Sequence, residues 1–122
     1  MATILVIEDN SEIRNVLCVM LEKAGHEVRD ALNGEEGIEK YREWQADLVM
    51  TDLFMPKKAG IETISELMEI NPEVKIVAMT AHGTEEQYDF LRVAEALGAV
   101  ATLDKPFSNK ELLDIVEAAR AG

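Results

Sequence analysis

The sequence predicts an α/β domain built on a parallel sheet. Short apolar runs of strand length alternate with amphipathic segments of helical length along the whole chain. That alternation is typical of βα units with right-handed crossovers. Most of the strand runs are continuously apolar, as expected where helices cover both faces of a sheet. Because 122 residues suffice for one core, we expect residues 1–122 to form a single domain.

Five runs of five or six residues predict strands. The first reads "TILVI", and the last three are similarly apolar. The second, "EVRDA", is the most polar because it contains Glu27, Arg29 and Asp30, which favours a position at an edge of the sheet. The predicted strands are 3–7, 27–31, 47–51, 75–80 and 99–103.

Five amphipathic segments follow these strands in turn. Apolar residues in the first recur at the i, i+3, i+4 spacing of a helix, which Gly25 ends at a C′ position. Capping pairs mark three helix starts, and Asn71-Pro72 closes the third helix. The predicted helices are 11–24, 34–44, 61–70, 84–97 and 108 to the C-terminus, with capping pairs Asn33 and Glu36, Thr84 and Gln87, and Ser108 and Glu111.

Composition narrows the classes of function. The chain has 24 acidic and 12 basic residues and a net charge of −12, so direct binding to nucleic acid or to an anionic membrane surface is disfavoured. The only cysteine, Cys18, falls in a helical pattern and is interpreted as a packing residue. The N-terminus lacks the features of a signal peptide, and no apolar run approaches the ~20 residues of a membrane span. We expect a cytoplasmic protein.

Chemically active side chains follow the predicted strands. Glu8 and Asp9 come after the first strand, Asp52 after the third, Thr80 ends the fourth, and Lys105 follows the fifth. The carboxyl ends of parallel strands meet at one edge of a sheet, where ligands of such folds bind. We therefore expect these five side chains to lie together.

Three carboxylates at one edge repel one another unless a cation neutralises them, and Mg²⁺ suits hard oxygen ligands. A hydroxyl, an ammonium and a carboxylate nucleophile complete the parts needed for phosphoryl transfer. Each residue also has an ordinary structural interpretation. The first two acids can accept hydrogen bonds at a helix N-terminus, Asp52 can cap a turn before Pro56, Thr80 can be a strand residue and Lys105 a surface lysine. The combination at four strand ends favours function.

Four motifs then carry a family resemblance. They are "LVIED" (5–9), "DLFMP" (52–56) followed by Gly60, "MTA" (79–81) and "DKPF" (104–107). Over essentially its whole length the chain resembles the receiver domain of bacterial two-component response regulators, of the chemotaxis response-regulator type. The resemblance implies a doubly wound, flavodoxin-like (βα)5 fold with strand order 2-1-3-4-5.

The resemblance also implies roles. Asp52 would be the phosphoacceptor. Asp9 would bind Mg²⁺ directly and Glu8 through water, with Asp52 and the backbone carbonyl of Phe54 completing the protein's ligands. Lys105 would hold the phosphoryl group.

In similar proteins, four further positions tune the switch, and the resemblance assigns them here. Thr80 would be the hydroxyl that moves toward the phosphoryl group together with the loop after the fourth strand. The position three before the lysine usually holds Tyr or Phe but is Thr102 here, which predicts weaker coupling to the surface of the fourth helix, fifth strand and fifth helix. By the resemblance, Phe54 and His82 would flank the path of attacking water, and a bulky Phe54 predicts a long-lived phosphoryl group. We interpret His82 as a solvated loop residue, and we expect His26 at the surface.

The resulting hypothesis is a signalling phosphoacceptor rather than an enzyme, monomeric or weakly dimeric. Its partners would be a sensor histidine kinase or histidine phosphotransfer protein and a downstream protein or output domain. No output domain precedes Gly122, which fits a stand-alone receiver or part of a longer regulator.

Three alternatives have less support. A Mg²⁺-dependent aspartate-nucleophile phosphatase would have a D-x-D pattern, with a second Asp two residues after the nucleophile. This chain has Phe54 at that position. Flavin binding conflicts with Glu8 and Asp9, because their charges would repel the flavin phosphate. A docking module that is never phosphorylated has no need of the complete acidic site.

Overall fold

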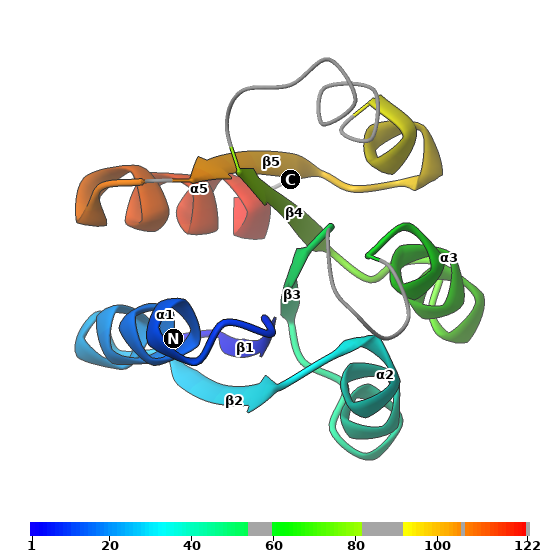
Figure 1. Ribbon diagram of the computed structural model, residues 1–122, viewed down its shortest axis with the longest axis horizontal. Helices are drawn as coiled ribbons and strands as arrows, with labels where there is room; N and C mark the ends of the chain where they lie inside the picture. Colours follow the sequence, from blue (N-terminus) through cyan, green and yellow to red (C-terminus); the bar gives the residue numbers. More distant parts are fainter. Residues whose placement is uncertain (54–59, 82–91, 106, 122) are drawn as a thin grey trace.

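The computed structural model describes residues 1–53, 60–81, 92–105 and 107–121. Its centre is a parallel sheet in the order β2-β1-β3-β4-β5, which confirms the predicted fold class (Figure 1). The polar run 27–31 is an edge strand, as predicted. The strands are β1 (Thr3–Ile7), β2 (Glu27–Ala31), β3 (Leu48–Asp52), β4 (Ile76–Ala81) and β5 (Ala101–Lys105).

Helices cover both faces of the sheet. Figure 1 shows α1 and α5 on one face and α2 and α3 on the other. The helices are α1 (Ser11–Lys23), α2 (Gly34–Glu43), α3 (Gly60–Ile70) and α5 (Asn109–Ala121), and residues 92–97 are also helical. Among the described residues, no helix is long and apolar enough to cross a membrane.

Side-chain caps set several helix starts. The Asn33 side chain accepts a hydrogen bond from the Glu36 amide at 2.9 Å. Ser108 and Glu111 form the predicted reciprocal capping box, with distances of 3.0 and 3.2 Å. Asn10 caps α1 by accepting from the Ile13 amide at 3.1 Å. The predicted Thr84 and Gln87 pair lies outside the described residues.

The alternation of side chains along each strand divides the core into two layers. Ile4 and Val6 pack toward α1 and α5, whereas Leu5 and Ile7 pack toward α2 and α3. The first layer is completed by Leu17, Leu21, Leu48, Met50, Val77, Met79, Leu112 and Val116, and the second by Ile38, Tyr41, Val49, Ile64, Leu67 and Ile76. All of these side chains are buried, so the sheet is held rigidly from both sides.

Three strands end later than predicted. β3 and β4 each extend one residue further, and β5 covers 101–105 instead of 99–103. The start of β5 is delayed because the amides of residues 98 and 99 still hydrogen-bond to the end of the preceding helix. Gly98 has a positive φ of 121°, and the amides of Gly98 and Ala99 donate to the carbonyls of Glu95 and Ala94. Asp52 and Lys105 are therefore the last residues of their strands and share the rigidity of the sheet.

His26 is buried, and the expectation that it lies at the surface was wrong. The end of α1 explains its position. Gly25 has a φ of 94°, and the amides of Gly25 and His26 donate to the carbonyls of Glu22 and Leu21, which turns the chain back onto the helix. His26 Nδ1 then accepts a hydrogen bond from the Ala2 amide at 3.1 Å. Cys18, interpreted as a packing residue, is half-buried.

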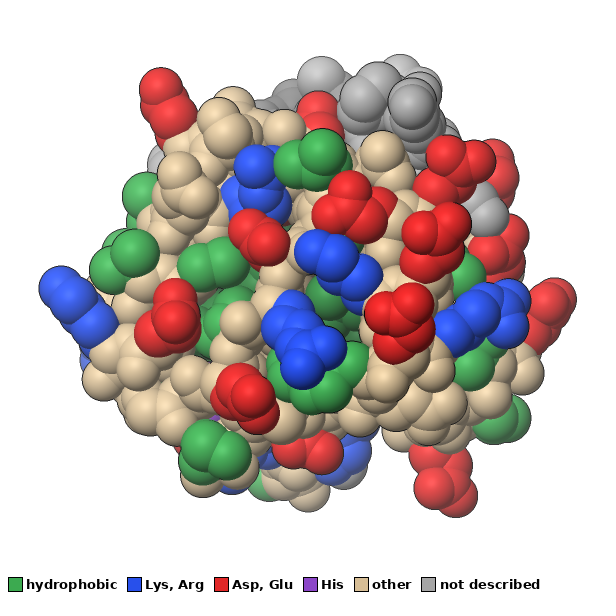
Figure 2. Space-filling model, turned by 90° about the horizontal axis from the view of Figure 1, so that it is seen from below, with side chains coloured by type: hydrophobic (Ala, Val, Ile, Leu, Met, Phe, Trp, Pro, Cys, Tyr) green, Lys and Arg blue, Asp and Glu red, His purple; other side chains and the backbone are tan. Residues whose placement is uncertain are grey.

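Basic and acidic side chains are mixed on one face of the molecule. Figure 2 shows one face of the molecule, on which Lys and Arg side chains are interspersed with Asp and Glu. The described residues on this face do not gather their basic side chains into a single patch.

Candidate functional site

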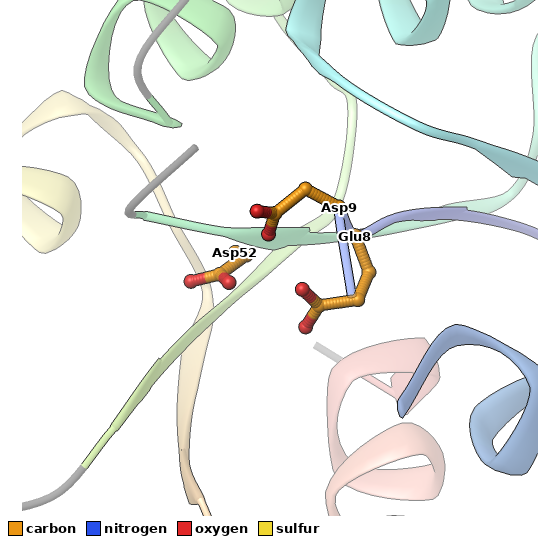
Figure 3. A group of neighbouring side chains, drawn as sticks. All are labelled: Glu8, Asp9 and Asp52. Carbon is orange, nitrogen blue, oxygen red and sulfur yellow. The ribbon is translucent and has the colours of Figure 1, made fainter. Parts of the chain in front are cut away.

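Three carboxylates converge where β1 and β3 end. One carboxylate oxygen from each of Glu8, Asp9 and Asp52 lies within 4.8 Å of the others. Figure 3 shows the three side chains directed into the same region beyond the strand ends. Glu8 and Asp52 are buried, whereas Asp9 is exposed. The cluster therefore has one open side, facing solvent.

Backbone pairing places these residues. Ile7 pairs with Thr51, so β1 and β3 end side by side. Gly60, the first residue of α3, lies so close behind β3 that a Cβ at this position would meet the backbone oxygen of Asp52 and lie 2.5 Å from Leu53 Cα. Its amide donates to the Leu53 carbonyl at 3.1 Å. The lack of a side chain at Gly60 thus lets α3 approach the strand end that carries Asp52.

Lys105 joins two of the carboxylates. Its Nζ donates to Asp52 Oδ2 at 3.0 Å and also to Glu8 Oε1. The side chain starts on β5 and crosses the end of β4 to reach β3 and β1. Only 13% of its surface is exposed, so the interpretation as an ordinary surface lysine does not fit this geometry.

The burial of this group governs its protonation. Burial above all, and the nearby charge of Asp52, raise the pKa of Glu8 to about 7, although the hydrogen bond from Lys105 lowers it. Burial also lowers the pKa of Lys105, but its hydrogen bonds and charge attraction to Glu8 and Asp52 outweigh that effect and raise the pKa above its ordinary value. The site thus contains more negative than positive charge and favours an added cation.

Thr80 lies at the same edge. It follows Met79, the residue in register with Asp52, and its side chain is 1% exposed. Thr102 is half-buried in β5 and pairs with Ala78, a member of the core layer that also contains Ala94 of the 92–97 helix. Two further predicted positions, Phe54 and His82, lie outside the described residues. All five side chains predicted to gather at the strand ends are at this edge of the sheet.

Comparison with known proteins identifies the family. The model of the response regulator receiver domain matches residues 4–117. The chain belongs to this family. It is therefore a receiver domain of a two-component response regulator.

The relatives of this receiver domain include a protein of about the same length and a much longer one. It is 36% identical to the chemotaxis protein CheY of Thermotoga maritima over 114 residues, which cover 91% of each chain. It is 39% identical to the DNA-binding transcriptional regulator NtrC of Azospirillum brasilense over 118 residues, or 97% of this chain but 24% of that protein. A crystal structure of a receiver domain from Clostridium thermocellum matches with a TM-score of 0.92, at 32% identity, covering 99% of this chain and 95% of that one.

The structure adds two receiver-domain contacts that the sequence did not reveal. One is the hydrogen bond from Lys105 to Glu8, and the other is the bond from Arg14 to the Glu8 backbone carbonyl at 2.9 Å. Arg14 lies near the start of α1, six residues after Glu8. Because helical side chains point back toward the helix N-terminus, an arginine at this position was the signal in the sequence for the contact with Glu8.

Proposed function

We propose that this receiver domain accepts a phosphoryl group on Asp52 from the phosphohistidine of a sensor histidine kinase or histidine phosphotransfer protein. The observation that carries the proposal is the position of Lys105 Nζ, 3.0 Å from Asp52 Oδ2, beside the three converging carboxylates. A nucleophile, a fixed cation and a set of oxygen ligands thus lie within a few side-chain lengths of one another.

The donor set fits Mg²⁺. Three carboxylates with one solvent-facing side leave room for the several waters that Mg²⁺ retains. Asp9 and Asp52 would bind the ion directly and Glu8 through water, with the Phe54 carbonyl as a further ligand from outside the described residues. When bound, Mg²⁺ supplies positive charge that offsets the repulsion between the carboxylates and an incoming phosphoryl group.

The chain's own residues perform the transfer step. A carboxylate oxygen of Asp52 forms a bond to phosphorus, the phosphorus–nitrogen bond of the donor breaks, and its electron pair remains on the imidazole nitrogen. Lys105 holds an oxygen of the transferred group, which requires its ammonium to turn away from Asp52. Hydrolysis of the acyl phosphate returns the free carboxylate, so the domain acts as a signalling phosphoacceptor rather than as a metabolic enzyme.

Phosphorylation then changes partner binding. We expect the hydroxyl of Thr80 to move toward the phosphoryl oxygens and to shift the loop after β4, which alters the surface of the 92–97 helix, β5 and α5. This surface would contact a downstream protein or an output domain, because relatives of this chain include both the chemotaxis protein CheY and a transcriptional regulator. We propose that residues 1–122 work as one such unit, in the cytoplasm, as a monomer or weak dimer.

Phosphorylation by a small donor tests the proposal. Incubation with Mg²⁺ and acetyl phosphate should add the mass of one phosphoryl group, in an acid-stable and base-labile bond. Asp52→Asn should abolish this gain, whereas Asp114→Asn, which changes an exposed carboxylate on α5, should not. An equal mass gain in Asp52→Asn, or none in the parent protein, would refute the proposal.

A further inference from the structure

We infer that Arg14 is a positioning residue for the acidic site, which it holds by tying the Glu8–Asp9 peptide to β2. The inference rests on the proposed function, because it concerns the same magnesium ligands. Among the described residues, Arg14 donates hydrogen bonds to the Glu8 backbone carbonyl and to Asp30, and neither acceptor is a carboxylate of the cluster.

The guanidinium of Arg14 bridges two elements. Its Nη1 donates to the backbone carbonyl of Glu8 at 2.9 Å, and its Nε donates to Asp30 Oδ2 on β2 at 3.2 Å. The side chain of Arg14 is only 13% exposed. This guanidinium is mostly buried and donates one hydrogen bond to a carboxylate and one to a backbone carbonyl. Because the guanidinium is planar, the two bonds together restrict its orientation more than an exposed ion pair would.

The β2 end of this bridge is itself anchored. Asp30 pairs with Val6 in the sheet, and its backbone carbonyl accepts a hydrogen bond from Lys40 of α2. The next residue, Ala31, accepts from the Glu8 amide at 3.1 Å. Glu8 is thus held on its amide side by β2 and on its carbonyl side by Arg14.

Peptide planarity transmits this restraint to Asp9. The Glu8 carbonyl and the Asp9 amide belong to one planar peptide unit, so fixing the oxygen fixes the direction in which the Asp9 Cα leaves it. Asp9 is exposed, and it immediately precedes the helix cap Asn10. We therefore attribute the orientation of the Asp9 carboxylate toward the cluster to the Arg14 bridge.

Electrostatics and positioning predict opposite effects of removing Arg14. A positive charge near the carboxylates opposes the binding of another cation, so loss of that charge alone should strengthen Mg²⁺ binding. Loss of a positioning contact should weaken it, as loss of the outer partners of metal ligands generally does. The direction of the change therefore separates the two roles.

The main experiment measures the Mg²⁺ dissociation constant by calorimetric titration. In Arg14→Met the constant should rise roughly tenfold. Arg14→Lys should recover part of the affinity, because an ammonium can reach one of the two partners but cannot bridge both. Arg120→Met removes a cation that pairs with Glu117 near the end of α5 and should leave the constant unchanged. An unchanged or smaller dissociation constant in Arg14→Met would overturn the inference.

Two further experiments separate the role of Arg14 from a folding defect and from the proposed function. One uses a second variant, and the other measures amide exchange without Mg²⁺. Asp30→Asn removes the charge at the β2 end and should raise the Mg²⁺ dissociation constant by a smaller factor, with urea unfolding confirming that it folds. Without Mg²⁺, the amide of Asn10, which donates to Glu8 Oε2 at 3.2 Å, should exchange hydrogen faster in both variants, while the Leu53 amide should not.

Unaltered exchange at Asn10 in both variants would contradict the inference even where Mg²⁺ binding changes. Failure of the parent protein to bind Mg²⁺ would instead refute the magnesium-dependent function, while the exchange measurement still decides the role of Arg14.

Discussion

The ammonium nitrogen of Lys105 lies 3.0 Å from Oδ2 of Asp52, although the two residues are 53 positions apart and β4 separates their strands. The same nitrogen donates to Glu8, so one cation serves two buried carboxylates. Among the described residues, Lys105 is therefore a cation that the two buried carboxylates share.

Replacing Lys105 by Met should reveal both of its roles. Two buried carboxylates lose the ammonium that they share, so the free energy of unfolding in EDTA should fall by about 3–5 kcal/mol. Phosphorylation by acetyl phosphate should slow on the order of a hundredfold, because one donor to the transferred group is gone. Lys110→Met, which removes an exposed lysine paired with Asp114, is the matched control. Equal urea midpoints and rates for the two variants would contradict this assignment.

The pH dependence of stability should report on Glu8. Its pKa is about 7 in the folded protein and 4.5 as the ordinary value, so the folded state binds this proton more tightly than the unfolded state does. Without Mg²⁺, the stability due to protonated Glu8 is present below pH 4.5 and is lost as the pH rises through about 7, a change of up to about 3 kcal/mol. Urea unfolding across this range should show the decline in the parent protein and not in Glu8→Gln. Parallel curves of stability against pH for the two proteins would disprove the assignment to Glu8.

Protonation of His26 should change stability in the opposite direction, so that stability falls as the pH falls. Burial, and secondarily the charge of Arg120, lower its pKa below 6.5, although Glu117 raises it. Its contribution to stability is thus present above pH 6.5 and is lost as the pH falls through the lowered pKa of the folded state, because a protonated Nδ1 cannot accept from Ala2.

His26→Leu should remove this loss and cost about 1–3 kcal/mol at neutral pH, because the Ala2 amide is left without its acceptor. Urea unfolding should be compared in a Glu8→Gln background, which eliminates the opposing effect of Glu8. Persistence of the acid-induced loss in His26→Leu would assign it to another group.

Gly60→Ala should be destabilising, although alanine ordinarily favours a helix over glycine by about 1 kcal/mol. The added Cβ would meet backbone atoms of Asp52 and Leu53, which can move only if the strand end moves. We expect a loss of about 1–3 kcal/mol and slower phosphorylation of Asp52. In Gly37→Ala the three atoms nearest to the added Cβ all belong to the Ile7 side chain, so stability should fall without an effect on phosphorylation. A Gly60→Ala protein that is more stable than the parent would exclude this packing role.

Thr102→Tyr should strengthen the coupling between phosphorylation and the output surface. Thr102 pairs with Ala78, in the core layer that reaches the 92–97 helix, so a larger side chain here would contact the region that Thr80 is expected to move. Addition of acetyl phosphate should then change the amide chemical shifts of α5 more in the variant than in the parent. Identical shift changes in both proteins would argue against a role for this position.

The pattern of residues was sufficient to predict an α/β domain on a parallel sheet, whereas the strand order was predicted from the family resemblance. Continuous apolar runs such as "TILVI" and the helical spacing of Leu17 and Leu21 depend only on local periodicity, and both are found in the core as expected. The edge position of β2 followed from its charged residues, and the site followed from the rule that parallel strands bring their carboxyl ends together. The errors concerned strand ends, where helix-terminal hydrogen bonds at Gly98 and Ala99 delayed β5, and His26, which is buried rather than at the surface.

The sequence by itself therefore determined which fold forms and at which edge Glu8, Asp9, Asp52, Thr80 and Lys105 meet. Only the tertiary structure decided how they meet. The Lys105–Glu8 bond joins residues 97 positions apart, and the burial of His26 depends on the N-terminal strand and α5. The Arg14 bridge likewise requires α1 and β2 to pack at a fixed distance. Local periodicity specifies the elements, whereas these contacts depend on strand register and side-chain reach between elements.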